Sequence, residues 1–494
     1  RDKDQSILEF FPANKSWQLT SLRGFRTFIK VNSGTKPAIY EPFRNGTANL
    51  NFNLANSMAI NAYGLELREV NVSLGLEINV EYYTIPNDSY AALVRKVSVK
   101  NTGKHAKSLQ ILDGLPQINP FGTNNFFLKK LGRTIEAWMN VQNLENKAPF
   151  YRLAIDPSDK PEVVHITEGN FYLACHQHRG KTEMIKPIVD PDSIFAHVND
   201  FSYPYEFLKQ KKFGYPKDQA TSSKTPCGFL LLNTGLSKSQ EKTFYSVIGY
   251  MRSIETLNSS LKRIASVEYL ESKQAENKGV IEELTKDIET ASSSKEFDLY
   301  VKQTYLDNIM RGGYPQTFRS DKGAKVFYLY SRKHGDIERD YNKFQLSATY
   351  LSQGNGNYRD ANQNRRNDIW FNPEIKDENL STFINLIQAD GFNPLVVKGS
   401  NFKLEKNGWL EKELPKITGE KETAQIVSFL KQPFSPGELI HFIEDNKIKL
   451  NASYDDLLNM VLPLCETMHD AEHGEGFWTD HWTYNLDLIE SYLN

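Results

Sequence analysis

The chain has 494 residues, of which 39% are hydrophobic and 24% charged, a composition typical of a globular protein of about two to four domains. Its 59 basic and 61 acidic residues nearly cancel, which excludes the basic footprint of proteins that bind nucleic acid or anionic membranes. The three cysteines lie far apart, so neither a zinc site nor a disulfide framework is indicated, and the count predicts a reducing compartment, the cytoplasm.

Residues 1–252 predict an antiparallel β-sandwich domain. Segments such as 57–84 alternate apolar and polar residues with a period of two, as strands with one buried face do. Turn signals such as 119–122 separate these segments, and no helical pattern lies between them, which favours a sandwich. The stretch 208–228 is predicted to be a long surface loop.

Residues 253–294 predict a helical linker of about two helices, because apolar residues recur with helical spacing among charged ones. Residues 295–494 are predicted to form a helical domain with long polar loops at 312–375 and 390–420, and long loops often carry function. Its expected helices cover 295–313, 377–389, 422–431, 436–445 and 453–469. Because the chain begins at Arg1 and ends inside an amphipathic pattern, we expect sequence to be missing at one or both ends.

The segment 330–368 predicts a site for a polar ligand. It is rich in Arg, Asp, Asn, Gln and Gly and has almost no apolar periodicity. Sugar hydroxyls need donors and acceptors in fixed directions, which such side chains supply, and the glycines of 353–357 allow close approach of the backbone. A solvated loop is the alternative, but interleaved aromatic residues such as Tyr350 and Tyr358 disfavour disorder.

The segment 469–485 holds four acidic residues, three histidines and two tryptophans. A metal site of His469, His473 and His481 is disfavoured, because the spacing matches no zinc motif. Two interpretations of Asp480 stay open. It caps a helix beside core tryptophans, or it is a general acid between two indole faces, where burial raises its pKa. Both interpretations expect a helix to start near Thr483.

These two segments resemble motifs of glycoside hydrolase family 94, the inverting disaccharide and oligosaccharide phosphorylases. The stretch 354–364, GNGNYRDANQN, is similar to the glycine-rich region of the family's non-reducing-end glucose subsite. The stretch 476–482, GFWTDHW, is similar to the family's W-x-D motif. The resemblance is closest to the 1,2-β-oligoglucan phosphorylase branch. It implies a β-sandwich (1–252), a helical linker (253–294) and the N-terminal portion of an (α/α)6 catalytic barrel (295–494).

The resemblance also implies roles for individual residues. Asp480 is the expected general acid. The expected substrate-binding residues are Arg359, Asp360, Trp478, Gln363, Tyr358, Arg332, Glu475 and His473. Disaccharide phosphorylases carry an arginine where this chain has Gly354, so that sugar contact must be rebuilt, for which Arg332, Arg339 and Arg365 are candidates.

The expected reaction is inverting phosphorolysis of β-1,2-linked glucooligosaccharides, which releases α-glucose 1-phosphate. Phosphate is the nucleophile and co-substrate, so one protein acid suffices and no cofactor or metal is expected, whereas an inverting hydrolase needs a second carboxylate. Two alternatives stay open. One is a hydrolase or transglycosylase on the same fold, with Glu466, Glu472 or Glu475 as base, and the other is a non-catalytic carbohydrate-binding protein. The family implies a homodimer. The near-balanced charge predicts no nucleic-acid or membrane partner.

Overall fold

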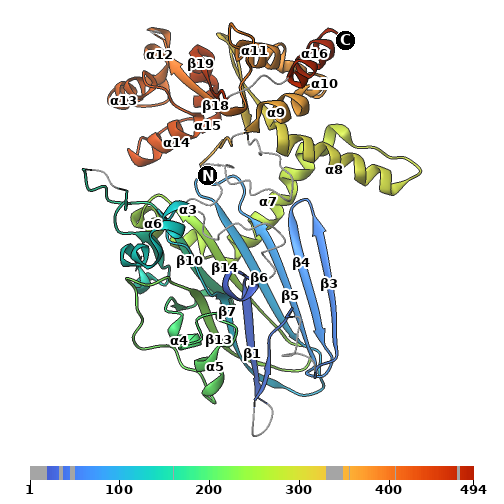
Figure 1. The fold of residues 1–494 in the computed structure, drawn as a ribbon, viewed down its shortest axis with the longest axis vertical. Coiled ribbons are helices and arrows are strands. Elements are labelled where there is room, and N and C mark those ends of the chain that lie inside the picture. Colours follow the sequence, from blue (N-terminus) through green and yellow to red (C-terminus); the bar gives the residue numbers. More distant parts are fainter. Residues whose placement is uncertain are drawn as a thin grey trace. The chain divides into compact units, whose positions relative to one another are not determined.

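A computed structural model of the chain describes residues 19–32, 37–44, 51–158, 161–329, 349–354, 356–405, 408–474 and 479–494. It divides into two compact units, Asp2–Ile281 and Glu282–Asn494, which are described one at a time (Figure 1). None of the helices in the described ranges combines the length and the apolar character needed to traverse a lipid bilayer.

The first unit is built on two antiparallel sheets. The smaller sheet contains β1 (Arg26–Asn32), β2 (Ala38–Tyr40), β7 (Lys107–Leu115), β12 (Pro187–Ile188) and β13 (Gly228–Leu236), in the order β12-β13-β7-β1-β2. The larger sheet contains β3 (Leu54–Asn61), β4 (Gly64–Asn71), β5 (Leu76–Thr84), β6 (Ala92–Asn101), β8 (Met139–Gln142), β9 (Phe150–Leu153), β10 (Gly169–His178), β11 (Lys181–Met184) and β14 (Glu241–Met251). Its order is β3-β4-β5-β6-β14-β10-β9-β8, and β11 pairs with β10.

The predicted sandwich is confirmed by the way the two sheets share one core. In β5, Leu76, Ile78 and Val80 are fully buried, while the residues between them are only partly buried, which is the expected period of two. These side chains belong to the same apolar cluster as Ile111 of β7 and Leu230 of β13 in the other sheet. The sheets therefore pack face to face.

The opposite face of the smaller sheet is covered by the segment between β11 and β13. Phe28 and Phe229 point to this face and pack with Phe195 of α4 (Asp192–Phe195), and Phe213 and Cys227 join the same cluster. The prediction of a surface loop at 208–228 is therefore wrong at Phe213 and Cys227, because their side chains are 2% and 0% exposed. The short helices of this unit are α2 (Thr20–Arg23), α3 (Asn125–Lys130), α4 (Asp192–Phe195) and α5 (Tyr205–Lys209).

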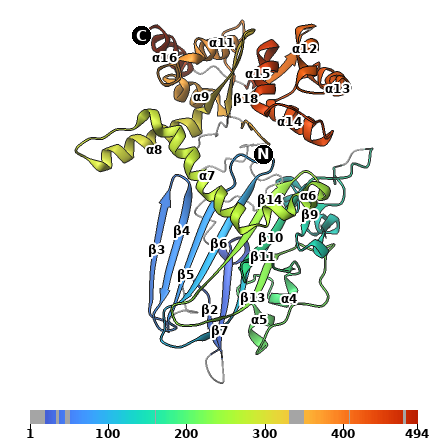
Figure 2. The same ribbon diagram turned by 180° about the vertical axis from the view of Figure 1, so that it is seen from behind.

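The predicted linker contains two helices, α6 (Ile254–Ile264) and α7 (Val267–Thr285), seen from behind in Figure 2. Ser253 caps the first of them, because its side chain accepts a hydrogen bond from the backbone of Thr256. Leu257 and Leu270 join a cluster with Phe171 of β10 on the outer face of the larger sheet. Both helices therefore pack on the sandwich.

The second unit mixes helices with two small antiparallel sheets. Its helices are α8 (Lys295–Gly312), α9 (Tyr358–Arg365), α10 (Asp368–Phe371), α11 (Glu378–Asn385), α12 (Gly408–Glu413), α13 (Glu420–Leu430), α14 (Pro436–Asp445), α15 (Tyr454–Val461) and α16 (Asp480–Leu493). Strands β15 (Tyr314–Ser320) and β16 (Gly323–Leu329) form a hairpin, and β17 (Gly356–Asn357), β18 (Val396–Leu404) and β19 (Cys465–Glu472) form the other sheet. The ring of an (α/α)6 barrel stays a prediction.

One predicted helix of this unit is wrong in its second half. The helix expected at 453–469 ends at Val461. A short 3₁₀ turn, Leu462–Leu464, follows and contains Pro463, and 465–472 is strand β19. Proline cannot continue the helix, and the alternating burial of β19 is the period of a strand. The predicted loops at 312–375 and 390–420 likewise contain regular elements, β15, β16 and β18 among them.

Candidate functional site

Five of the predicted site residues lie on two helices, α9 and α16, that run parallel: Tyr358, Arg359, Asp360, Gln363 and Asp480. The ring of Tyr358, the first residue of α9, stacks on His481 at the start of α16, with a centroid distance of 5.3 Å. One turn further along both helices, Nδ2 of Asn362 donates to Oδ1 of Asn485 at 2.6 Å. Because the contacts advance in the same direction on both, the two N-termini lie at the same end.

This shared end brings together residues from the two resemblance motifs. Nη1 of Arg359 lies 3.9 Å from Oδ2 of Asp480, and each side chain is 47% exposed. Seven residues later on each helix, Nη1 of Arg366 and Oδ2 of Asp487 repeat the pairing at 2.9 Å. The Arg359–Asp480 pair is thus the first of two ion pairs along the α9–α16 seam, the line of contact between these two helices.

Asp360 differs from Asp480 in being almost fully buried, with 4% of its surface exposed. Its Oδ1 lies 3.4 Å from Nε of Arg359, and its Oδ2 accepts a hydrogen bond from Nδ2 of Asn357 at 2.9 Å. The guanidinium of Arg359 is therefore held between a buried and an exposed carboxylate. Helix N-termini also favour negative charge, which suits both acids.

The burial expected for Asp480 is not observed, and this corrects the sequence prediction. Its side chain is half-exposed, and the neighbour described beside it is a cation. The helix begins at Asp480 and not near Thr483, because Thr479 occupies the N-cap position. Asp480 is therefore the first helical residue, which also corrects its alternative role as the cap. The predicted residues Trp478, Glu475 and Arg332 lie outside the described part of the chain.

The three histidines of the segment each lie against a different neighbour. Nε2 of His473, a predicted substrate-binding residue, is 3.0 Å from the carbonyl oxygen of Leu386, and the side chain is exposed. His469 contacts Ser400 and His481 contacts Asn393, both at 2.8 Å, and burial lowers the pKa of both imidazoles. Among the described residues, no three His, Cys, Asp or Glu side chains are grouped closely enough to hold a metal ion.

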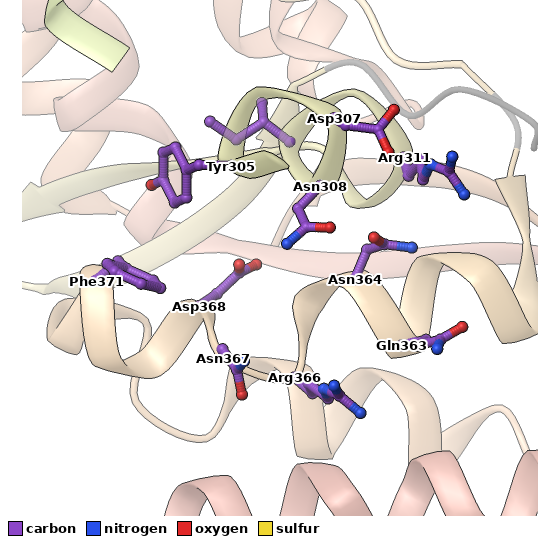
Figure 3. Close-up of a pocket in the computed structure, with 11 residues that line it drawn as sticks. Tyr305, Asp307, Asn308, Arg311, Gln363, Asn364, Arg366, Asn367, Asp368 and Phe371 are labelled. Atoms are coloured by element: carbon purple, nitrogen blue, oxygen red, sulfur yellow. Dashed lines mark ion pairs between the residues drawn. The ribbon is translucent and has the colours of Figure 1, made fainter. Parts of the chain in front are cut away.

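Gln363, another predicted substrate-binding residue, lines a cleft of about 310 Å³ between α8 and the α9–α10 segment (Figure 3). Tyr358, in contrast, is fully buried, and its hydroxyl donates to Phe383 O at 2.9 Å and Asn485 Oδ1 at 3.0 Å. Tyr358 therefore joins α9 to α11 and α16. Because its ring is fully buried, it cannot make the predicted contact with a substrate.

The sequence analysis missed Asp368, the first residue of α10, which lines the same cleft. Burial raises the pKa of the Asp368 carboxyl to about 7, even though hydrogen bonding from Tyr328 and the nearby charge of Arg365 oppose the shift. Asp368 thus shows the raised pKa that the sequence analysis predicted for the general acid. No local signal could have identified it, because Tyr328 lies 40 positions earlier in the chain.

Comparison with known proteins yields neither a matching family model nor a matching curated protein. Similar solved structures include a polysaccharide lyase, with 10% identity, a TM-score of 0.28, and coverage of 53% of this chain and 31% of that one. A bacterial glucoamylase complexed with acarbose has 10% identity and a TM-score of 0.36, and the match covers 95% of this chain and 61% of that one. A protein from the human microbiome named as a kojibiose phosphorylase has 8% identity and a TM-score of 0.20, with coverage of 59% of this chain and 29% of that one. The chain spans less than two thirds of each. At TM-scores below 0.5, these likenesses establish neither the fold nor the activity of this chain.

Proposed function

We propose that the chain belongs to an inverting glycoside phosphorylase that acts on β-1,2-linked glucooligosaccharides, with Asp480 as the general acid. The observation that carries the proposal is the 3.9 Å approach of Arg359 to Asp480. The two residues come from separate motifs, each similar to a part of the same family's site, and the parallel helices α9 and α16 bring them to one end of the seam.

In the proposed reaction, a phosphate oxygen forms a bond to the anomeric carbon while the bond from that carbon to the leaving sugar oxygen breaks. Asp480 donates its proton to the leaving oxygen, and α-glucose 1-phosphate is released. No second carboxylate is required, because phosphate arrives as an anionic nucleophile. A bound sugar would cover the exposed half of Asp480 and exclude water from it.

Arg359 and Asp360 would hold the glucose whose anomeric carbon reacts. Asp360 is fixed by Asn357 and by Arg359, so its orientation is set before a ligand arrives. A guanidinium donates hydrogen bonds and a carboxylate accepts them. Together they match two neighbouring sugar hydroxyls, of which one accepts and the other donates.

The experiment is incubation of the purified intact protein with sophorotriose in matched buffers with and without inorganic phosphate. We expect glucose 1-phosphate to form only with phosphate, and its α configuration to be visible by proton NMR. Equal cleavage in both buffers would replace the proposal with hydrolysis or transfer. Binding of sophorotriose without turnover in either buffer would replace it with a non-catalytic carbohydrate-binding function.

A further inference from the structure

The cleft between α8 and the α9–α10 segment is rich in groups that both donate and accept hydrogen bonds. Its lining includes the carboxamides of Asn308, Gln363, Asn364 and Asn367. Asn308 extends from α8 and Asn364 from α9, so that they approach from opposite sides (Figure 3). Each carboxamide offers an oxygen acceptor and two N–H donors, which is what a hydroxyl-rich ligand requires.

The charged side chains of the cleft are matched with one another or with a neighbour. On α8, Arg311 pairs with Asp307 at 2.8 Å, and across the α9–α16 seam Arg366 pairs with Asp487 at 2.9 Å. Burial raises the pKa of Asp368 to about 7, which favours the neutral carboxyl over the carboxylate. The lining therefore favours an uncharged ligand over a phosphate or a metal cation.

One end of the cleft is aromatic. The rings of Tyr305 on α8 and Phe371 on α10 meet edge to face, with a centroid distance of 5.2 Å. Phe371 is 40% exposed, although large apolar side chains are usually buried. An exposed aromatic ring beside polar groups can pack against the C–H face of a sugar ring.

We propose that this cleft is a second ligand site, separate from the Arg359–Asp480 pair, for a neutral polyhydroxylated ligand of about one sugar ring. The carboxamides would hold its hydroxyls, and Tyr305 and Phe371 would contact its apolar face. The volume of about 310 Å³ is at the small end of the range for ligand pockets, which limits the occupant to a small molecule or one unit of a chain. The inference does not depend on the proposed phosphorolysis, because binding here requires no turnover.

The test is titration of the intact protein with glucose and, separately, with sophorose, with hydrogen exchange used to locate the binding. We expect slower exchange in peptides covering 303–312 and 363–371. Asn308→Leu keeps the branched shape and the number of side-chain heavy atoms but removes the hydrogen bonds, and it should weaken binding by about three- to tenfold. Gln303→Leu, an exposed carboxamide on α8 that does not line the cleft, is the matched control and should bind as the unmodified protein does.

Failure of this proposal is distinguishable from failure of the proposed reaction. Protein carrying Asp480→Asn should still show protection at the cleft, whether or not sophorotriose is cleaved. The second site is refuted when glucose and sophorose leave exchange in both peptides unchanged, or when Asn308→Leu and Gln303→Leu bind equally. Protection by inorganic phosphate alone, without protection by either sugar, would show an anion site and would also refute it.

Discussion

The hydroxyl of Tyr328, on β16, donates a 2.9 Å hydrogen bond to Oδ2 of Asp368 at the start of α10. The same Tyr328 ring lies beneath the guanidinium of Arg365, at 3.6 Å from its centroid, and its hydroxyl accepts a hydrogen bond from Asn379 at 2.7 Å. The carboxyl of Asp368 is thus held by Tyr328 of strand β16 and lies near Arg365 of α9, and its surroundings desolvate it.

Asp368→Asn should stabilise the protein at pH 8 more than at pH 4. The folded-state pKa of about 7 is above the ordinary value of 3.8, so the folded protein binds the proton more tightly than the unfolded chain. The contribution of Asp368 to stability is therefore complete below about pH 4 and is lost as the pH rises toward 7. Asn keeps an acceptor for Tyr328 but carries no charge.

We expect the unfolding midpoint of Asp368→Asn to exceed that of the unmodified protein by a few degrees at pH 8, and to match it at pH 4. Scanning calorimetry at both values measures the difference. A midpoint difference that stays the same at both pH values would mean that the carboxyl does not titrate in this window.

Asp480→Asn should lower the rate of glucose 1-phosphate formation by about 10²- to 10⁴-fold, the usual loss when a general acid is removed. Asp487→Asn is the matched control, because Asp487 makes the equivalent ion pair with Arg366 seven residues later on the same helix. Phosphorolysis assays under saturating phosphate compare the two. Equal rates for both variants would remove Asp480 from the reaction.

Leu488→Ala should destabilise the second unit by about 2–5 kcal/mol, because Leu488 is 3% exposed and packs in one cluster with Tyr358 of α9 and Phe383 of α11. Leu486 lies on the same helix with 57% of its surface exposed, so Leu486→Ala should change stability by less than about 0.5 kcal/mol. Urea unfolding monitored by hydrogen exchange in α9 and α16 provides the measurement. Similar losses in both variants would contradict the packing described for this seam.

Arg95→Met should destabilise the sandwich by about 3–5 kcal/mol. Its Nη2 pairs with Oδ1 of Asp113 at 2.9 Å inside the first unit, and removal of the cation leaves a carboxylate with no exposed surface uncompensated. Arg68→Met breaks a pair of similar length, to Glu77 at 2.8 Å, but Arg68 is 48% exposed, so solvent screens the pair and its loss should leave stability almost unchanged. Denaturant titration of both variants would reveal the contrast, and comparable costs would contradict it.

The sandwich could be predicted from the sequence because its information is local. Alternation in β5 is visible in the order of residues. The helix expected at 453–469 shows the limit, since the apolar residues before Pro463 suit a helix and those after it suit a strand, and the pairing of β19 with β18 decides between them.

The site was predictable only in part, for a related reason. Two short motifs named Arg359 and Asp480, and the structure places their side chains 3.9 Å apart. Exposure could not be read in the same way. The sequence placed Asp480 between indoles and gave Asp368 no role, whereas burial depends on which distant segments cover a residue, and Tyr328 covers Asp368.

The parallel course of α9 and α16 has a consequence for how the protein reaches its working state. Neighbouring helices that point the same way need a return path, and here the chain between Arg366 and Asp487 spans 121 positions. Closing so large a loop is entropically unfavourable and depends on the intervening strands and helices, so the seam should be among the later parts to form. A growing chain that has not yet reached Asp480 contains Arg359 without its partner. Formation of the Arg359–Asp480 contact should therefore mark a late stage of folding.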